Sequence, residues 1–156
     1  MRIAAYIVAA SLLILCVTGC PLSPPGETVY FLVANPDAPE KGSYVLPLED
    51  AEDIDHARAV IADPAGSTGH IVVASIARGG RDLPYQNRDL INGGTLWSWR
   101  VEEFQGFADA TIEILDGWPQ YVEDNLDDWM ANTGGQIGFW NARVIREVSV
   151  EEMAGP

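Results

Sequence analysis

The hydrophobic pattern begins with an apolar run at residues 3–17, which carries no charge and follows a single arginine, Arg2. A helix that spans a bilayer needs about 20 such residues. The stretch after the run, residues 18–26, is rich in Pro, Gly and Ser and does not extend it. The pattern therefore predicts an export signal, with a short uncleaved membrane anchor as the alternative.

The next region contains two segments that are typical of strands. Residues 28–34 and 43–48 are rich in β-branched and aromatic side chains. A loop with Asn, Pro and Gly separates them. Pro47 places the second segment at an edge or an end of a sheet, because proline cannot donate a ladder hydrogen bond.

A helix is predicted over residues 51–62. Asp50 is a suitable N-cap residue, because its side-chain oxygen can accept from the first free N–H groups of the helix. Ile54, Ala57 and Ile61 recur at helical spacing. A proline two residues past the segment ends the pattern.

Four further strands are predicted in the second half of the chain. The first is apolar on both faces, which is typical of a central strand, and the others alternate apolar and polar positions. In the third, Ile112 and Ile114 are expected to point inward. The four segments are residues 70–78, 96–104, 110–116 and 138–148.

A second helix is predicted after Pro119, a residue suited to the first helical position. Val122, Leu126 and Trp129 then follow at the spacing of one helical face. The predicted order is strand-strand-helix-strand-strand-strand-helix-strand. This order favours an α+β domain with a mostly antiparallel sheet and two helices packed on one face.

Both cysteines lie near the N-terminal run, Cys16 inside it and Cys20 just after it. The segment Val17-Thr18-Gly19 before Cys20 resembles the lipobox of bacterial lipoproteins. The resemblance implies a diacylglycerol on the Cys20 sulfur, cleavage before that residue, and an acyl chain such as palmitate on the new N-terminus. A disulfide between the two cysteines is excluded in the mature chain, because Cys16 lies in the segment to be removed.

This interpretation sets the domain organisation. Residues 1–19 are the lipoprotein signal peptide, 20–28 a semi-rigid tether, 29–150 a single α+β domain, and 151–156 a tail. The expected location is the cell envelope, lipid-anchored and facing the periplasm or the exterior. Pro21, in place of the Asp that often retains lipoproteins in the inner membrane, favours the outer membrane where the host has one.

The charge of the chain limits its partners. Its formal net charge is −14, and Lys41 is the one lysine. Nucleic acid and anionic lipid headgroups are excluded, because both need clusters of Lys and Arg. The partners expected are membrane lipid, reached through the acylated N-terminus, and a protein or glycan of the envelope.

No metal and no cofactor is expected. Residues 49–55 hold several acids, which leaves a calcium-stabilised structural domain as an alternative. They do not follow the calcium-loop pattern of helix-loop-helix proteins, and acids are favoured at the start of a helix without any ion. The phosphate, dinucleotide, zinc and hydrolase-elbow motifs are not found.

Three carboxylates on or beside predicted strands are the candidates for catalysis: Glu102, Glu113 and Asp116. Two carboxyls at a suitable separation can cleave a glycosidic bond. The alternative is that these carboxylates are ordinary solvent-facing residues of the strands, without a catalytic role. Neither histidine, His56 or His70, has a marked nucleophile beside it. An enzyme is therefore not favoured, and an envelope hydrolase stays as the alternative.

The leading hypothesis is a binding or interaction module. Residues 79–94 read as a long loop, and loops longer than about 12 residues are often functional. Two tryptophans follow it, and exposed aromatic rings anchor sugars or proteins, although alternating tryptophans also fit a core. The candidate contact residues are Tyr85, Asn87, Arg88, Trp97 and Trp99.

Five short motifs extend over nearly all of the predicted domain. The residues that carry them are Ile54, Ala57 and Arg58; Tyr85 and Trp97; Ile112, Glu113 and Asp116; Tyr121, Val122, Glu123 and Leu126; and Trp140, Arg146 and Glu147. Together they resemble the BP-seventy-four N-terminal domain family. The long loop before the second motif, and the lack of cysteines near the third and fifth, depart from the family pattern. The resemblance implies a fold and no particular activity.

Overall fold

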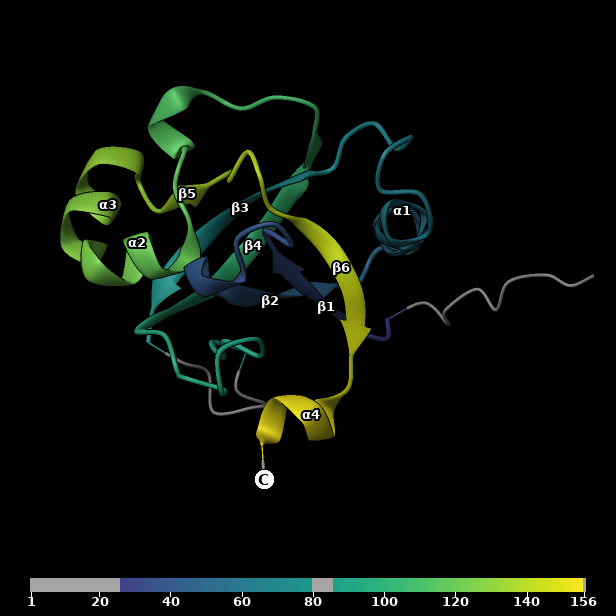
Figure 1. The fold of residues 1–156 in the computed structure, drawn as a ribbon, viewed down its shortest axis with the longest axis horizontal. Helices are drawn as coiled ribbons and strands as arrows, with labels where there is room; N and C mark the ends of the chain where they lie inside the picture. The colour runs from purple at the N-terminus through teal and green to yellow at the C-terminus, as the bar shows by residue number, and fades with distance from the viewer. Residues whose placement is uncertain (1–25, 80–85, 156) are drawn as a thin grey trace, which may run out of the picture.

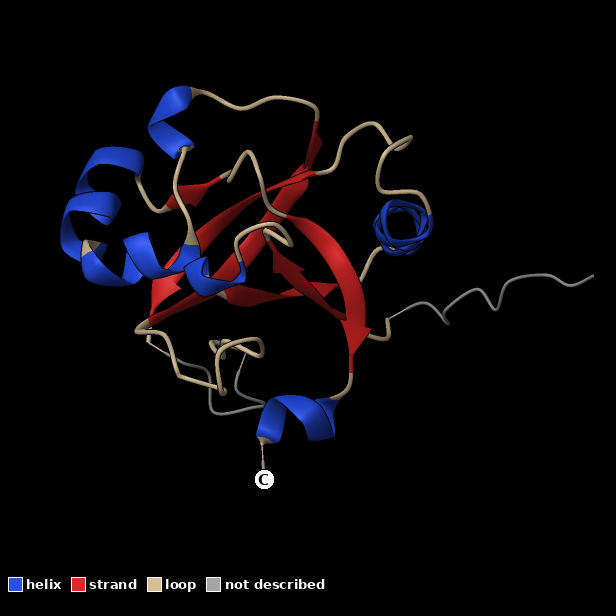
Figure 2. Cartoon of the chain, in the orientation of Figure 1, coloured by secondary structure: helices blue, strands red, loops and turns tan. Residues whose placement is uncertain are grey.

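The computed structural model describes residues 26–79 and 86–155 of the chain. They form two antiparallel sheets of three strands each, with short helices around them (Figures 1 and 2). The predicted α+β class is confirmed. Within the described residues, no helix has the length and apolar character needed to cross a membrane.

The first sheet has the strand order β2-β1-β6. Its strands are β1 (Val29–Ala34), β2 (Ser43–Leu48) and β6 (Arg143–Val148). A short 3-10 helix, η1 (Pro39–Lys41), joins the first two. In the central strand β1, Phe31 and Val33 face the main core and Leu32 faces a second apolar cluster, because successive strand residues point to opposite faces.

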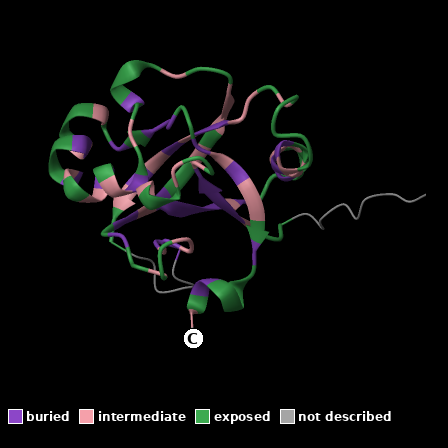
Figure 3. Ribbon diagram, viewed as in Figure 1, coloured by how far each residue is buried: buried purple, intermediate pink, exposed green. Residues whose placement is uncertain are grey.

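The second sheet has the order β4-β3-β5. Its strands are β3 (Ile71–Arg78), β4 (Trp99–Ala108) and β5 (Gln136–Ile137). The predicted central position of the apolar strand β3 is confirmed. The two sheets enclose the main core between them, and β2 contacts β4 across it. Buried residues run along the strands of both sheets (Figure 3), and in β1 and β2 they lie on both faces.

The predicted first helix is confirmed as α1 (Ala51–Ala62). The Asp50 Oδ1 atom accepts from Glu52 N at 2.9 Å and from Asp53 N at 3.4 Å, so it caps the helix as expected. The helix packs against β6 through a face that includes Ile54 and Ala57. In Figure 1 it lies on the opposite side of the molecule from α2 and α3.

The predicted second helix is present as two pieces, α2 (Pro119–Asp124) and α3 (Leu126–Thr133). They meet at Asn125, whose backbone φ of −128° leaves the helical region. The predicted apolar face of Val122, Leu126 and Trp129 is buried. Gly134 ends α3 in the left-handed conformation that glycine adopts without strain.

The strand expected at residues 110–116 is wrong. This segment contains the 3-10 helix η2 (Glu113–Leu115), and both isoleucines expected to be buried are solvent-facing, with Ile112 64% and Ile114 50% exposed. The segment pairs with no strand, and its hydrogen bonds are local: the Ile112 and Glu113 carbonyls accept from the backbone N of Leu115 and Asp116 at 3.0 and 2.9 Å. An alternating segment without a neighbouring strand edge has no ladder to join.

The closing strand also begins later than expected. Trp140, predicted on its buried face, lies in a turn and is 38% exposed, whereas Ala142 and Val144 are buried. At the C-terminus, the residues expected to form a tail include most of the helix α4 (Val150–Ala154). Its Met153 is fully buried in the second apolar cluster, beside Leu32 and Val45.

Candidate functional site

Two cavities hold the predicted catalytic carboxylates, and they share no lining residue. We call the first the acidic cavity. It has a volume of about 380 Å³ and is formed by β1, β2, β4 and α1. We call the second the aromatic cleft. It has a volume of about 460 Å³ and is formed by η2, α2 and α3.

Glu102 lines the acidic cavity from β4. Its Oε2 atom accepts from Nη2 of Arg100 at 2.6 Å, so the carboxylate is held in an ion pair. Glu113 and Asp116 line the aromatic cleft instead. The three predicted carboxylates therefore do not meet in one place, and Glu102 cannot form a catalytic pair with the other two.

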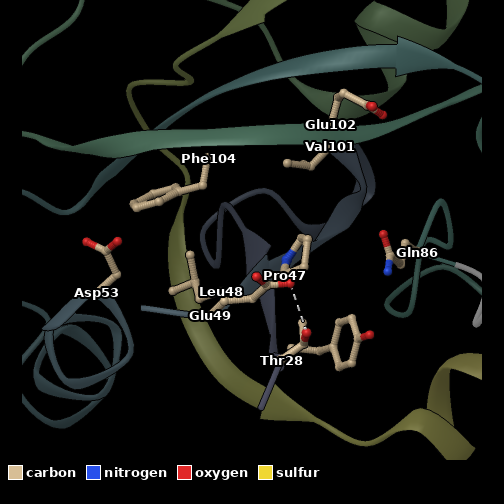
Figure 4. Close-up of a pocket in the computed structure, with 10 residues that line it drawn as sticks. Thr28, Pro47, Leu48, Glu49, Asp53, Gln86, Val101, Glu102 and Phe104 are labelled. Atoms are coloured by element: carbon tan, nitrogen blue, oxygen red, sulfur yellow. Dashed lines mark hydrogen bonds between the residues drawn. The ribbon is translucent and has the colours of Figure 1, made fainter. Parts of the chain in front are cut away.

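The acidic cavity contains two further carboxylates, Glu49 and Asp53 (Figure 4). Glu49 Oε1 accepts from the hydroxyl of Thr28 at 3.2 Å. The pKa of Asp53 is raised above its ordinary value, first by burial and then by the negative charge of Asp50. Burial and Asp50 thus disfavour the ionised form of Asp53, while the nearby His56 acts in the opposite direction. The described residues contain no cluster of three or more metal-ligating side chains.

The predicted contact residues of the long loop have structural roles where they are described. Asn87, Trp97 and Trp99 are buried, with 7%, 3% and 0% of their surface exposed. Asn87 Nδ2 donates to the Trp97 carbonyl at 2.6 Å, and the Trp97 indole donates to the Ser43 carbonyl at 2.8 Å. The two indoles stack with centroids 6.2 Å apart. These side chains belong to the core and not to a contact surface.

The other two loop candidates lie elsewhere. Tyr85 is outside the described residues. Arg88 is half-buried and packs its guanidinium against two glycines: a Cβ added at Gly94 would lie 2.8 Å from its Nη1 atom, and one at Gly155 would lie 2.7 Å away. Arg88 therefore fastens the loop against the C-terminal end of the chain.

Asp89 is a structural residue that the sequence analysis did not single out. It is 1% exposed. Its Oδ1 accepts from the backbone N of Ser43 at 3.1 Å, from the Ser43 hydroxyl at 2.7 Å and from the backbone N of Ile91 at 3.0 Å. Its Oδ2 accepts from Asn92 Nδ2 at 3.0 Å. An Asp followed three residues later by Asn and Gly is a turn signal that would have indicated the Asx turn, though not the contact with β2.

The aromatic cleft combines exposed rings with polar side chains. Tyr121 is 41% exposed, and its ring centroid lies 5.2 Å from that of Trp118 and 6.1 Å from that of Trp129. The lining residues are Glu113, Ile114, Asp116, Tyr121, Asn125, Asp128, Trp129, Asn132 and Thr133. The cleft therefore offers ring surface beside carboxylate and amide groups.

Exposed apolar side chains gather near this cleft. Ile114 and Tyr121 line it and are 50% and 41% exposed, and the exposed Trp118 packs against Tyr121. A smaller cavity of about 130 Å³ adjoins the cleft through the shared Asp116. There, Lys41 Nζ lies 4.6 Å from the ring centre of Trp118. Such a patch with a polar rim is typical of a binding surface.

Sequence reasoning missed this surface for a physical reason. It assigned one face of the second helix to the core, which was correct, and gave no role to the outward face that carries Tyr121, Asn125 and Asp128. A helix that buries one face presents the other to solvent. The signal available was an aromatic ring on that solvent face, where polar side chains are the rule.

Four of the five family-like motifs, distant in the sequence, meet in two pairs in the fold. Arg58 Nε of α1 donates to Glu147 Oε1 of β6 at 2.7 Å. Glu123 of α2 accepts from the backbone N of Ser98 at 2.7 Å and from its hydroxyl at 2.8 Å, next to Trp97. These motif residues fasten helices to the strands and their flanking segments, so they explain a shared fold and not a shared chemistry.

Comparison with known proteins agrees with this fold-level resemblance. None of the curated proteins and none of the solved structures matches the chain. The BP-seventy-four N-terminal domain matches over residues 27–151, which takes in every strand and almost the whole described domain. The chain therefore belongs to the BP-seventy-four N-terminal domain family.

Proposed function

We propose that this protein is a lipid-anchored binding module of the cell envelope, and that its aromatic cleft holds a neutral glycan. The observation that carries the proposal is the exposed pair of rings, Trp118 and Tyr121, beside a cleft lined by carboxylate and amide groups. The anchoring half of the proposal is supported by the apolar run and the lipobox-like residues before Cys20.

The chemistry of the cleft suits a sugar. One face of a pyranose ring presents C–H groups, which pack on the face of an aromatic ring such as Tyr121. Its hydroxyls both donate and accept, so they pair with the Asp128 carboxylate and with the amides of Asn125 and Asn132. A protein of net charge −14 repels anionic polysaccharides. A neutral glycan is therefore the favoured ligand class.

Hydrolysis by Glu113 and Asp116 is the second candidate, because these two carboxylates do share the aromatic cleft. A retaining or inverting glycosidase places its two carboxyls on either side of the scissile bond. Both side chains are exposed here. Exposed carboxylates leave a bound glycosidic bond open to water, whereas charged groups act most strongly on a reaction in a site that excludes water. Binding without cleavage is therefore our preferred function.

The test is a titration of the full-length protein, purified in detergent, with neutral glucan and chitin oligosaccharides and with an anionic uronate oligosaccharide. Indole fluorescence is the readout, because Trp118 and Trp129 lie beside the cleft. We expect saturable binding of a neutral sugar, weakened about tenfold or more in Tyr121→Ala through loss of the stacking face. The matched control is Leu96→Ala, another exposed apolar residue outside the cleft.

Two results would overturn the proposal. Equal weakening in Tyr121→Ala and Leu96→Ala would place the ligand elsewhere. Shortened sugars in the reaction mixture, lost in Glu113→Gln, would assign the cleft to hydrolysis instead.

A further inference from the structure

The acidic cavity contains a buried acceptor without a donor. Gln86 is 7% exposed, and its Oε1 atom is buried with no hydrogen-bond partner. Figure 4 shows its amide directed into the cavity, toward the side that carries Pro47 and Val101. A buried carbonyl oxygen that has lost its water is stabilised only when an N–H or O–H group reaches it. The site therefore lacks a donor that a ligand could supply.

The charge of the cavity restricts which donor fits. Among the ten described residues that line it, three are acids and none is Lys, Arg or His. Glu102 is already engaged by Arg100. Glu49 and Asp53 have no arginine or lysine in any ion pair described for this region. The burial that raises the pKa of Asp53 would be offset by a nearby cation. A cationic N–H donor meets all of these demands.

The polar groups are spread along the cavity. In Figure 4, Gln86 and Asp53 lie at opposite ends, with Glu49 between them. They do not form a cluster that could surround one metal ion within the described residues. Leu48, Val101 and Phe104 line the space between the polar groups. Acceptor groups and apolar side chains thus alternate along the cavity. A ligand that contacts all of them must be longer than a single ion.

We propose that the acidic cavity binds a linear aliphatic polyamine. One ammonium group donates to Gln86 Oε1 and to the Glu49 carboxylate. A second lies near Asp53, and the methylene chain between them packs on Leu48 and Phe104. Ammonium groups also favour aromatic faces, which Phe104 and Tyr30 supply. This proposal is independent of the glycan proposal, because the two cavities share no residue.

The test is calorimetric titration of the full-length protein in detergent with spermidine at about 0.15 M ionic strength, where attraction between exposed charges is largely screened. We expect one saturable site. 1,8-Octanediol, of similar length but uncharged, should not bind. Glu49→Gln and Gln86→Leu should each weaken binding about tenfold. Asp124→Asn is the control, because it removes one exposed charge outside the cavity. It should change the affinity less than twofold, since solvent and salt screen an exposed carboxylate.

A second variant protects the test against misfolding. If Gln86→Leu unfolds the protein, Gln86→Glu keeps an acceptor at the same place and adds a negative charge, and it should bind spermidine more tightly than the wild type. Equal weakening in Glu49→Gln and Asp124→Asn would show non-specific attraction and overturn the proposal. So would the lack of a saturable site in the wild type, or weaker binding by a folded Gln86→Glu.

Discussion

At the scale of single residues, the loop after β3 is held by one buried carboxylate. Asp89 accepts hydrogen bonds from Ser43 on β2 and from two residues of its own turn. Hydrogen bonds to charged groups contribute more than neutral ones, and removing a buried partner leaves several donors unsatisfied. Ser43, whose carbonyl accepts from the Trp97 indole, is therefore held in place by Asp89, and Asp89 lines neither candidate cavity.

We predict that Asp89→Ala lowers the free energy of unfolding by about 3 kcal/mol, measured by urea denaturation. Asp89→Asn should lose less, because its Oδ1 still accepts from Ser43 while its Nδ2 meets the donor of Asn92. Asp37→Ala is the control: its side chain is exposed, so its effect should stay within about 0.5 kcal/mol. A loss below about 1 kcal/mol in Asp89→Ala would contradict the prediction.

Single residues also mark the limit of sequence reasoning. The periodic core residues Val122, Leu126 and Trp129 could be predicted, because burial of a helix face is a local pattern. The burial of Trp97 and Trp99 could not be decided, because alternation is the same whether a strand face meets solvent or a second sheet. The candidate cavities depend on side chains from distant elements, such as Gln86 with Glu49, and no local pattern joins these.

At the scale of elements, local signals specified α1, β1, β2 and β3, whose caps, turns and apolar runs are contiguous in the sequence. Long-range pairing decided the rest. The division into two sheets depends on β6 returning to β1, and residues 110–116 fail to form a strand because no free edge meets them. Alternation shows that a segment can form a strand but not that a partner is present.

The helix α4 is stabilised on β6 by an ion pair and a buried methionine. Arg146 Nη1 donates to Glu152 Oε2 at 2.9 Å, and its Nη2 donates to the other carboxylate oxygen. The hydrogen bond from Arg146 lowers the pKa of Glu152 below its ordinary value of 4.5. A lowered carboxyl pKa means that the folded state favours the ionised form, so this contribution to stability is present above the ordinary pKa.

We predict that the contribution of this pair is lost as the pH falls through the lowered pKa of Glu152. Glu152→Gln should cost up to about 1 kcal/mol at pH 7, because both partners are partly exposed, and much less at a pH below that pKa. Hydrogen exchange of the α4 amides at both pH values is the measurement. Glu103→Gln removes an exposed charge on β4, away from α4, and serves as the control. A loss that is the same at both pH values would contradict this account.

At the scale of the whole molecule, aromatic rings connect the helical side to the sheets. The ring centroids of successive pairs lie about 6 Å apart from Tyr121 through Trp129, Phe139 and Tyr44 to Trp99. Aromatic pairs at such distances add stability beyond the area they bury. The aromatic cleft is therefore built on the outer end of the main core, which gives its exposed rings a rigid support.

The anchor is also a property of the whole molecule, because it decides where the domain encounters a ligand. If the lipobox resemblance holds, protein purified from membranes with its native N-terminus should have the intact mass of residues 20–156 plus diacylglycerol, with any further acyl chain. Two or more acyl chains bind a membrane stably, whereas one chain alone binds only marginally. We therefore predict that the wild type partitions into the detergent phase, and that Cys20→Ser remains full-length or becomes soluble.

Cys16→Ser is the matched control: this cysteine lies in the segment to be removed, so its loss should leave processing unchanged. An unmodified full-length mass in the wild type would replace the lipid anchor with an uncleaved N-terminal one, and the domain would then stand at the inner membrane.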